Sequence, residues 1–517
     1  MIGIQTAIRA GRDPYKVAVT FGARRLTYRS LDQRSGALAT ALTSLGIGRG
    51  DRIAGLLTNC PQFLELIFAA AKLGAIFVPV NFRLAAPEVA RVLSACTPAL
   101  LFAGRDFGPM LAGLRANGDL TCPTIEVNDR PEAGVEDAPY EALLTGAPLD
   151  PIAAAPDEPL LLMHSSGTTG LPKGAIHTHG TVMASCMIKT IDFHLTGDDR
   201  AVVFGPLFHA GPLFDLTLPL LLRGGSVVLG ASRNFDAATL LRTMAEHRGT
   251  VAPVYPTMLR RLMTHGLGSH DLRTWRLIIT GGEAIAPSLL EQVQAALPNT
   301  DVVNNYGSTE GGPITTFLPR TEASRKIGSV GRPSFGMQVR IADERGQALP
   351  TGEVGEVLVR GPLVCAGYWN RPDLTTAAWR GPWWATGDLG RCDDEGYLWI
   401  VGRRTDMIKS GTESIYPGEV EDVIATLPGV VEVGVVGVPD PDWGETVAAF
   451  VVAAPGSGID ADTVMRHCRP NLAGYKLPRH IRFIDALPRT GANKISRKYL
   501  AERFDTNPDS YTSRPEP

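Results

Sequence analysis

The most informative stretch of this 517-residue chain is Ser165-Ser166-Gly167-Thr168-Thr169-Gly170-Leu171-Pro172-Lys173-Gly174. It follows an apolar run, Leu160-Leu161-Leu162-Met163, that is typical of a buried strand. Glycines let backbone N–H groups come close to an anion, hydroxyls add hydrogen-bond donors, and lysine adds positive charge. The stretch therefore predicts a loop that binds a polyphosphate. The Gly-x-x-x-x-Gly-Lys-Ser/Thr spacing of the nucleotide P-loop is absent, and a flexible Ser/Gly loop without a ligand is the alternative.

Strand and helix signals alternate on both sides of this loop. We expect a strand at Arg52–Leu57, a helix at about Pro61–Lys72 and a strand at Ile76–Val80. Further strands are expected at Ala201–Phe204, Ser226–Leu229 and Leu277–Thr280. This alternation predicts an α/β fold with largely parallel sheets. Loops that bind ligands should then lie at the carboxyl ends of the strands.

The pattern changes after about residue 325. Short strands separated by Gly and Asp turns predict a small antiparallel β subdomain, and from about residue 403 a helix near Pro417–Leu427 and further strands predict a separate α+β domain. The tail from residue 506 is polar and contains proline, so we expect it to be disordered. The predicted organisation is a large N-terminal domain at residues 1–402, a smaller C-terminal domain at 403–505 and a tail at 506–517.

The most apolar segment runs from Phe63 to Val80 but contains Glu65 and Lys72 and breaks at Gly74. We interpret it as an amphipathic helix followed by a buried strand, because a membrane span needs a longer uninterrupted apolar run. Charged residues interrupt the N-terminus early, which does not match a signal peptide. No transmembrane segment is expected, and peripheral contact with a membrane stays open.

Charge and cysteine content narrow the possible partners and compartment. The net charge is −3, which leaves no basic surplus to neutralise a phosphate backbone, so we expect no nucleic-acid partner. The seven cysteines are scattered and none has Cys-x-x-Cys spacing. An odd, dispersed set argues against a disulfide framework or a zinc site and predicts a cytoplasmic protein.

The loop at residues 165–174 resembles the phosphate loop of the adenylate-forming superfamily, which includes acyl-CoA synthetases, aryl-CoA ligases, luciferases and peptide-synthetase adenylation domains. Other segments resemble further motifs of that family, in the same order and with the same spacing over residues 27–500: Asn304–Glu310, Gly328–Pro333, Gly367-Tyr368, Trp384–Asp388, Gly402–Gly411 and Pro488–Lys494. We therefore identify the chain as a member of this superfamily, in which ATP, Mg²⁺ and often coenzyme A are used.

The resemblance implies roles for individual residues. Tyr306 would pack on adenine, Asp388 would accept hydrogen bonds from both ribose hydroxyls, and Arg403 would reach the ribose. Glu310 offers a hard oxygen ligand suited to Mg²⁺, with Thr168 as a second metal-site residue. Lys494, Lys173, Glu310 and His209 are the predicted catalytic residues. The remaining predicted contacts to cofactors are Ser165, Ser166, Gly167, Thr169, Gly170, Gly281, Gly282, Glu283, Asn304, Asn305, Gly307, Ser308, Thr309 and Gly411, the last of which matches a glycine lining the pantetheine tunnel of CoA.

Three positions depart from the family pattern. Thr405 stands at the hinge position, which is usually Asp or Lys, and Thr412 stands where a second glycine is usual. Asn493 replaces the glycine before the catalytic lysine, and asparagine tolerates left-handed backbone angles better than most residues. These changes bear on how the small domain rotates between the two half-reactions that the resemblance implies.

The acceptor and the acid are separate questions. Amino-acid adenylation domains carry an Asp that clamps the α-ammonium, but the nearest candidate, Asp215, lies about one helical turn too late and is interpreted as a polar residue at a helix end or core edge. Pro206-Leu207-Phe208-His209 instead resembles the Pro-x-Phe-His of CoA ligases, where the histidine lies at the mouth of the acyl pocket. A satisfied structural histidine is the alternative for His209. We expect a carboxylic acid–CoA ligase.

A non-catalytic AMP-binding relative should have lost its lysines or its acidic metal ligand, and this chain has kept Lys173, Glu310 and Lys494. A luciferase-like oxygenation is a rare alternative, and adenylation without CoA as the acceptor is another. For the acid, Gly311 and Gly312 are small enough to open a channel for an alkyl chain, which favours a fatty acid. Aryl and alicyclic acids are the alternatives.

Overall fold

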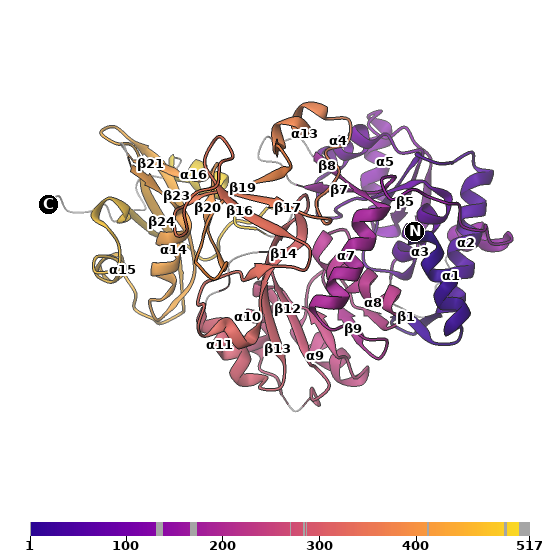
Figure 1. Ribbon diagram of the computed structural model, residues 1–517, viewed down its shortest axis with the longest axis horizontal. Helices are drawn as coiled ribbons and strands as arrows, with labels where there is room; N and C mark the ends of the chain where they lie inside the picture. Colours follow the sequence, from indigo (N-terminus) through magenta and orange to yellow (C-terminus); the bar gives the residue numbers. More distant parts are fainter. Residues whose placement is uncertain are drawn as a thin grey trace.

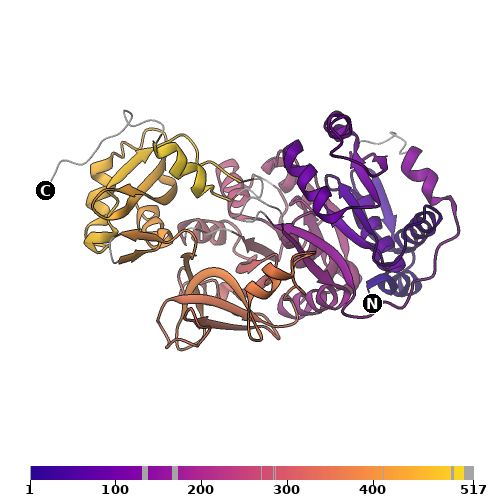
Figure 2. The ribbon, with the colours of Figure 1, turned by 90° about the horizontal axis from the view of Figure 1, so that it is seen from above.

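The computed structural model describes residues 2–130, 138–165, 173–268, 270–282, 285, 287–410, 413–490 and 494–505. Within these ranges the strands form four sheets, and two of them make up most of the N-terminal part. Figures 1 and 2 show the indigo-to-magenta N-terminal elements at one end of the molecule and the yellow C-terminal elements at the other. The fold is α/β, with a large N-terminal domain and a smaller C-terminal domain, as the sequence predicts.

The first sheet ends in the predicted phosphate loop. Its order is β6-β5-β3-β4-β7-β8 among the described strands, and the pairs from β6 to β7 are parallel. β7 pairs antiparallel with β8, so that Ser165 lies opposite Lys173 at the mouth of the loop. The loop thus leaves the carboxyl end of a buried strand, as predicted, and returns as a hairpin, which was not predicted. The strands are β3 (Arg52–Leu56), β4 (Ile76–Pro79), β5 (Leu100–Gly104), β6 (Thr124–Val127), β7 (Pro159–Ser165) and β8 (Lys173–Thr178).

The second sheet carries the other predicted nucleotide motif. Its described order is β15-β14-β13-β12-β11-β9-β10-β1-β2, with parallel pairs in the centre and antiparallel pairs at both edges. The motif Asn304–Glu310 begins in β13 and continues into the turn that follows it. The strands are β1 (Val17–Phe21), β2 (Arg24–Thr27), β9 (Arg200–Val203), β10 (Ser226–Leu229), β11 (Val251–Pro253), β12 (Leu277–Gly281), β13 (Asp301–Ser308), β14 (Gly312–Leu318) and β15 (Arg332–Pro333).

Helices cover these two sheets in the positions that βα alternation requires (Figure 1). The longest is α2, which begins after Thr27, whose side-chain hydroxyl accepts a hydrogen bond from the Ser30 amide. The helices of more than four residues in this part are α1 (Ile2–Arg12), α2 (Tyr28–Ser44), α3 (Pro61–Leu73), α4 (Ala86–Cys96), α5 (Gly108–Ala116), α7 (His179–Asp192), α8 (Leu218–Arg223), α9 (Ala237–Glu246), α10 (Pro256–His265), α11 (Pro287–Ala296) and the π-helical turn η3 (Pro212–Thr217).

Helix α3 differs from the prediction. All thirteen of its residues are buried, so the helix has no solvent-facing side and is not amphipathic. Glu65 accepts hydrogen bonds from Arg34 Nε and from Tyr140 Oη, both at 2.7 Å. Lys72 Nζ lies 2.7 Å from Asp32 Oδ1. Glu65 and Lys72, which suggested a solvent-exposed face, are therefore paired with partners inside the core. Across the described residues, no helix has the length and apolarity needed to cross a membrane.

The third and fourth sheets follow in sequence. The third is antiparallel, as predicted, and contains β16 (Gln338–Ala342), β17 (Gly355–Arg360), β18 (Trp379–Arg380), β19 (Trp383–Cys392) and β20 (Leu398–Arg403). The fourth packs with α14 (Pro417–Ala425), α15 (Ala461–Cys468) and α16 (Arg497–Asp505), and contains β21 (Ile408–Ser410), β22 (Glu413–Ile415), β23 (Val430–Asp440), β24 (Gly444–Ala453) and β25 (His480–Phe483). One strand therefore ends at Arg403 in the third sheet, and the next begins at Ile408 in the fourth.

Candidate active site

Three predicted nucleotide-binding residues meet in one cluster. Tyr306 on β13 donates a hydrogen bond from its hydroxyl to Asp388 Oδ2 at 2.7 Å, and Arg403 Nε lies 3.2 Å from Asp388 Oδ1. Asp388 and Arg403 are direct neighbours across the antiparallel pair β19–β20. Burial, reinforced by the Asp388 carboxylate, raises the pKa of Tyr306, so the phenol keeps its proton and donates it. We refer to these three residues as the ribose corner, after the role that the sequence predicts for Asp388 and Arg403.

The residues after β13 bring a carboxylate next to the end of the phosphate loop. Tyr368 donates from its hydroxyl to Glu310 Oε1 at 3.1 Å, and Lys173 Nζ lies 5.7 Å from the centre of the Tyr368 ring. His177 Nε2 lies 2.9 Å from the carbonyl oxygen of Thr309. Burial lowers the pKa of His177 to about 4, so this ring is neutral at pH 7 and can donate to that carbonyl. Lys173 and Glu310 are thus held near one another around Tyr368.

His209 and Lys494 are close enough to interact, although they are far apart in sequence. Burial lowers the pKa of His209 to about 3, and the positive charges of Arg83 and Lys494 lower it further. The His209 ring lies against Phe208 with centroids 4.2 Å apart. The lysine sits in a short loop closed by the hydrogen bond from the Thr490 amide to the Lys494 carbonyl, at 2.7 Å. The C-terminal domain therefore brings the ammonium of Lys494 to the segment that was predicted to form the mouth of the acyl pocket.

An ion-pair bridge joins the two domains near this loop. Glu432 on β23 lies 2.8 Å from Arg260 Nη2 on α10 and 2.6 Å from Arg489 Nη2. Arg489 begins the segment that leads to Lys494, and Arg260 belongs to the N-terminal domain. Glu432 thus connects the base of the lysine loop to the large domain.

Several predicted residues have structural contacts of their own. Asn304 Nδ2 donates to the carbonyl of Ser329 and Asn305 Nδ2 to that of Thr280. Gly281 ends β12 and Gly282 follows it, and a Cβ on Gly281 would lie 2.5 Å from the Asn305 carbonyl oxygen. Two further predicted residues shape the turn after β13: a Cβ on Gly307 would lie 2.3 Å from the Gly312 carbonyl oxygen, and Ser308 Oγ accepts from the Gly311 amide. The Asn and Ser side chains bond to backbone groups of neighbouring segments, and the glycines let the backbones pack closely, so these residues stabilise the end of β12 and the turn after β13.

Some predicted residues lie outside the described residues. They are Ser166, Gly167, Thr168, Thr169, Gly170, Glu283 and Gly411, with Thr412, Asn493 and the tail at 506–517. For Ser165 the structure gives the backbone, which ends β7. Among the described residues, the site therefore consists of the ribose corner together with Lys173, Glu310, His209 and Lys494.

One prediction on the acyl side is right only in part, and another is wrong. Asp215 lies in the first turn of η3, near a helix end as predicted, but it is not at the core edge, because only 3% of it is exposed. Gly311 and Gly312 do not open a channel on the side where a side chain would stand. A Cβ on Gly312 would lie 2.6 Å from Leu363 Cβ, and one on Gly311 would lie 3.1 Å from Val359 Cγ2. The small size of the two glycines serves close packing at the start of β14.

Sequence reasoning also missed some residues. Tyr368 was part of a matched dipeptide, Gly367-Tyr368, but no role was assigned to it. His177 and Arg83 were not singled out, and His177 carried a usable signal because it follows the phosphate loop by only three residues. Their importance comes from contacts with Glu310, Thr309 and His209 that the fold creates.

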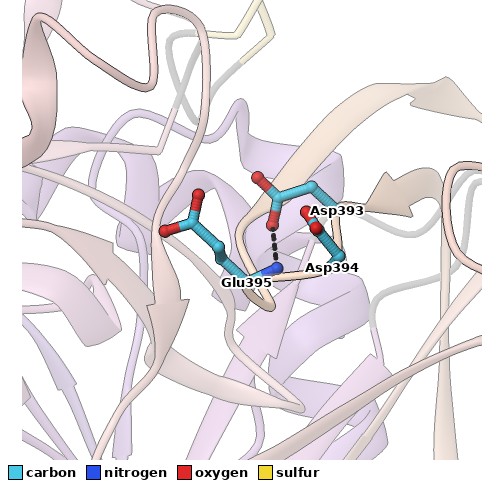
Figure 3. Close-up of side chains that lie close together, drawn as sticks. All are labelled: Asp393, Asp394 and Glu395. Atoms are coloured by element: carbon cyan, nitrogen blue, oxygen red, sulfur yellow. Dashed lines mark hydrogen bonds between the residues drawn. The ribbon is translucent and has the colours of Figure 1, made fainter.

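An acidic cluster lies apart from these residues. Figure 3 shows Asp393, Asp394 and Glu395 on the turn between β19 and β20, with the Glu395 amide donating to Asp393. Lys326 Nζ lies 2.6 Å from Asp393 Oδ2 and 2.5 Å from Glu395 Oε1. Because Lys326 already pairs with Asp393 and Glu395, we assign the cluster to the stability of the turn.

Comparisons with known proteins agree with this geometry. The AMP-binding enzyme family matches residues 7–369, and the AMP-binding enzyme C-terminal domain matches residues 419–494. A feruloyl-CoA synthase from an Amycolatopsis species is 39% identical over 96% of this chain and 97% of its own length. A long-chain-fatty-acid–CoA ligase of Mycobacterium tuberculosis is 38% identical over 93% of both chains.

Solved structures of MatB from Rhodopseudomonas palustris cover 98% of this chain and 99% of their own. The ATP-bound form matches with 28% identity and a TM-score of 0.87, and the apo form with 29% identity and a TM-score of 0.79. The arrangement seen here is thus more similar to the ATP-bound form. The matches to both domains, together with the relatives that cover nearly the whole chain, show that this protein belongs to the AMP-binding enzyme family, in the branch of AMP-forming acyl-CoA synthetases.

Proposed function

We propose that this chain joins a carboxylic acid to coenzyme A in two steps. In the first, a carboxylate oxygen attacks the α-phosphorus of ATP, and pyrophosphate leaves with the electrons of the broken P–O bond. In the second, the CoA thiol loses its proton and attacks the acyl carbon, and AMP leaves. A carboxylate is a poor acyl donor, and the adenylate replaces its charged oxygen with a good leaving group. The enzyme's task is to position the reactants and neutralise their charge.

The attachment of the Lys494 loop to the large domain, through the ion pairs of Glu432 with Arg260 and Arg489, is the observation that carries this proposal. Two anions, the carboxylate and the triphosphate, must meet in the first step, and a cation between them offsets their repulsion. The positive charge of Lys494 helps to lower the pKa of His209, which lies in the segment matched to the mouth of the acyl pocket. His209 is neutral at pH 7, since its pKa is about 3. We assign it to orienting the acid by hydrogen bonding, without adding charge.

The ribose corner and the residues around Tyr368 are assigned to ATP. Asp388 and Arg403 would hold the ribose, with Tyr306 fixed by its hydrogen bond to Asp388 so that its ring can support adenine. Lys173 would neutralise phosphate charge. Glu310 fits the hard-oxygen preference of Mg²⁺, because its carboxylate is positioned by Tyr368 beside the loop. Mg²⁺, when bound, would supply positive charge on the phosphates.

We further propose that residues 403–505 move as one domain between the two steps. The described strands change sheet between Arg403 and Ile408, and Thr405 lies in that interval. The greater similarity to ATP-bound MatB than to apo MatB supports an adenylation arrangement in the present structure. Rotation would withdraw Lys494 before CoA arrives. The scattered cysteines support our expectation that this chemistry takes place in the cytoplasm.

The sequence predicts a fatty acid as the substrate, with an aryl or alicyclic acid as the alternative. One argument for the fatty acid is weakened, because the space beside Gly311 and Gly312 is filled by Leu363 and Val359. The relatives include a feruloyl-CoA synthase and a long-chain-fatty-acid–CoA ligase, so both classes are kept. In either case the acid lacks an α-amino group.

A panel of fatty, aryl, alicyclic and amino acids tests the proposal. We expect AMP release that depends on CoA, with acyl-CoA identified by mass spectrometry, for at least one acid without an α-amino group. Amino-acid adenylates with no acyl-CoA from any other acid would overturn it. Pyrophosphate release without CoA measures the first step alone and separates adenylation from ligation.

A further inference from the structure

The turn that carries His209 lies between β9 and η3, at the carboxyl end of a strand of the second sheet. Residues 204–209 belong to neither a helix nor a strand, so no ladder of hydrogen bonds pairs their backbone groups. Leu207 and Phe208 are nevertheless buried. Because a buried backbone N–H or C=O without a partner destabilises the fold, this turn needs hydrogen bonds from another part of the chain.

Asn59, which belongs to the first sheet's side of the molecule, supplies these hydrogen bonds. It lies between β3 and α3, and only 1% of it is exposed. Its Oδ1 atom accepts from the Leu207 amide at 2.9 Å, and its Nδ2 atom donates to the Gly205 carbonyl at 2.9 Å. Both ends of one side-chain amide thus pair with the backbone on either side of Pro206, as a neighbouring strand would.

Further contacts fix Asn59 in place. Its backbone N–H donates to Ser232 Oγ at 3.0 Å, and Nδ2 also lies 3.3 Å from the Gly230 carbonyl oxygen, both in the segment after β10. The preceding residue, Thr58, donates from its amide and from its hydroxyl to Asp129 Oδ2, at 2.9 and 2.8 Å, in the segment after β6. Asn59 is therefore held by strand ends of both sheets.

A second residue from the first sheet's side packs on the ring beside His209. Phe82 lies beyond the end of β4, and its ring centroid is 5.0 Å from that of Phe208, with the two rings nearly perpendicular at 88°. In addition to burial, the positive charge of the next residue, Arg83, lowers the pKa of His209. The turn thus follows a strand of the second sheet, but its backbone and its Phe208 ring are held from the first.

We propose that Asn59 is a positioning residue for adenylation, and that by pairing with the backbone around Pro206 it sets where His209 meets the carboxylate of the acid. Asn59 acts through His209. A displacement of about 1 Å in a group that orients a reactant can slow a reaction by about 10²-fold. This inference rests on the proposed ligase function and deepens it, because it makes the orientation of the acid depend on contacts between the two sheets.

Asn59→Ala tests the effect in the full-length enzyme, with an acid from the panel that the unmodified enzyme uses. We expect kcat/KM for the acid, measured by pyrophosphate release, to fall about 10-fold or more. The KM for ATP should stay unchanged, because the ribose corner is built from other strands. Thr58→Val is the matched control: it removes the neighbouring hydroxyl, which bonds to Asp129, and should leave kcat/KM for the acid unchanged.

A double-mutant cycle with His209→Ala separates positioning from a general structural role. If Asn59 acts through His209, the loss caused by Asn59→Ala should disappear in the His209→Ala background. An equal loss in both backgrounds, an equal loss in Thr58→Val, or full activity of His209→Ala overturns the inference and leaves the ligase proposal intact. No pyrophosphate release by the unmodified enzyme with any acid overturns both.

Asn59→Asp keeps the shape of the side chain and carries the same cycle if Asn59→Ala does not fold. Burial raises the pKa of a carboxyl, and the protonated group can accept from Leu207 and donate to Gly205 as the amide does. We expect kcat/KM for the acid to stay near that of the unmodified enzyme at low pH and to fall as the new carboxyl ionises. The same fall in the His209→Ala background would contradict the inference.

Discussion

Tyr306 and Asp388 of the large domain hold Arg403 at the domain boundary, whereas Lys494 reaches the same site from deep within the C-terminal domain. The ribose corner is formed by a buried carboxylate with a partner on each oxygen. The lysine loop is connected to the large domain by the bridge from Arg260 through Glu432 to Arg489, whose side chains are partly exposed. Solvent screens ion pairs at both places, since the Arg403 side chain is 44% exposed. The ribose corner, however, is also fixed by strand pairing, because Asp388 and Arg403 are neighbours across β19–β20. The difference teaches that the ribose corner is built into one sheet, whereas the lysine loop reaches the site through contacts between domains, which can separate.

The largest expected effect on adenylation comes from removing Lys494. Lys494→Ala should slow adenylate formation by about 10³-fold, because the charge that offsets the repulsion of carboxylate and triphosphate is lost. Transfer of a pre-made acyl-adenylate to CoA should stay close to normal. The two half-reactions are assayed separately, and Lys498→Ala, at a highly exposed lysine on α16, serves as the control. If both half-reactions fall equally, the assignment of Lys494 to one step is wrong.

Glu310→Gln tests a group that belongs to the large domain, the carboxylate proposed to hold Mg²⁺. The change keeps the size of the side chain and its ability to accept a hydrogen bond from Tyr368, but it removes the negative charge proposed to hold Mg²⁺. We expect adenylation to fall by about 10²-fold, with a higher Mg²⁺ requirement and an unchanged Tm. Tyr368→Phe, which removes only the contact to Glu310 Oε1, should have a smaller effect. An unchanged rate at limiting Mg²⁺ would place the metal elsewhere.

Asp388→Ala should act through ATP binding. Loss of a carboxylate that accepts from ribose hydroxyls should raise the KM for ATP about 10-fold. The unmodified enzyme should prefer ATP to 2′-deoxy-ATP, and the variant should show less preference. Steady-state kinetics with both nucleotides measures this directly. Equal use of the two nucleotides by the unmodified enzyme would remove the ribose assignment.

The smallest effect is expected at the bridge between the domains. Arg260→Met should slow adenylation only about 2- to 5-fold, because one partly exposed ion pair is lost. Added salt should reduce the difference from the unmodified enzyme, and transfer from a pre-made adenylate should not be slowed. Arg261→Met changes the next residue of α10, whose guanidinium instead contacts the Phe235 carbonyl. A matching loss in both variants would mean that helix α10 was disturbed and the bridge does not position Lys494.

The sequence predicted those parts of the molecule that depend on local pattern and motif order. The parallel strands, the antiparallel subdomain and the C-terminal α+β domain were found from alternation and turn residues. The meeting of Asp388 with Arg403 follows from pairing of adjacent strands, and the motifs placed both near the ribose. Lys494 was matched by its motif, but only the folded chain shows its charge acting on His209.

The predictions that were wrong concerned residues whose surroundings are made by contacts with residues distant in sequence. Glu65 and Lys72 suggested a solvent-facing side for α3, yet their partners Arg34, Tyr140 and Asp32 come from other elements. Asp215 was placed by counting along an ordinary helix, whereas the segment forms a π-helical turn inside the core. No local pattern in the sequence carries either fact.

The pairing inside α3 also affects how the protein is made. On a growing chain Arg34 precedes Glu65, but Tyr140 follows Glu65 by 75 residues. Strand β7, which lies beside β4 in the finished sheet, is synthesised later still. Helix α3 therefore leaves the ribosome with only earlier elements, such as helices α1 and α2, available to cover it, and the rest of its apolar surface stays uncovered until later elements are made. Full burial of this helix therefore requires that roughly the first third of the chain has been synthesised. Until then its exposed apolar surface is prone to aggregation, from which chaperones protect nascent chains.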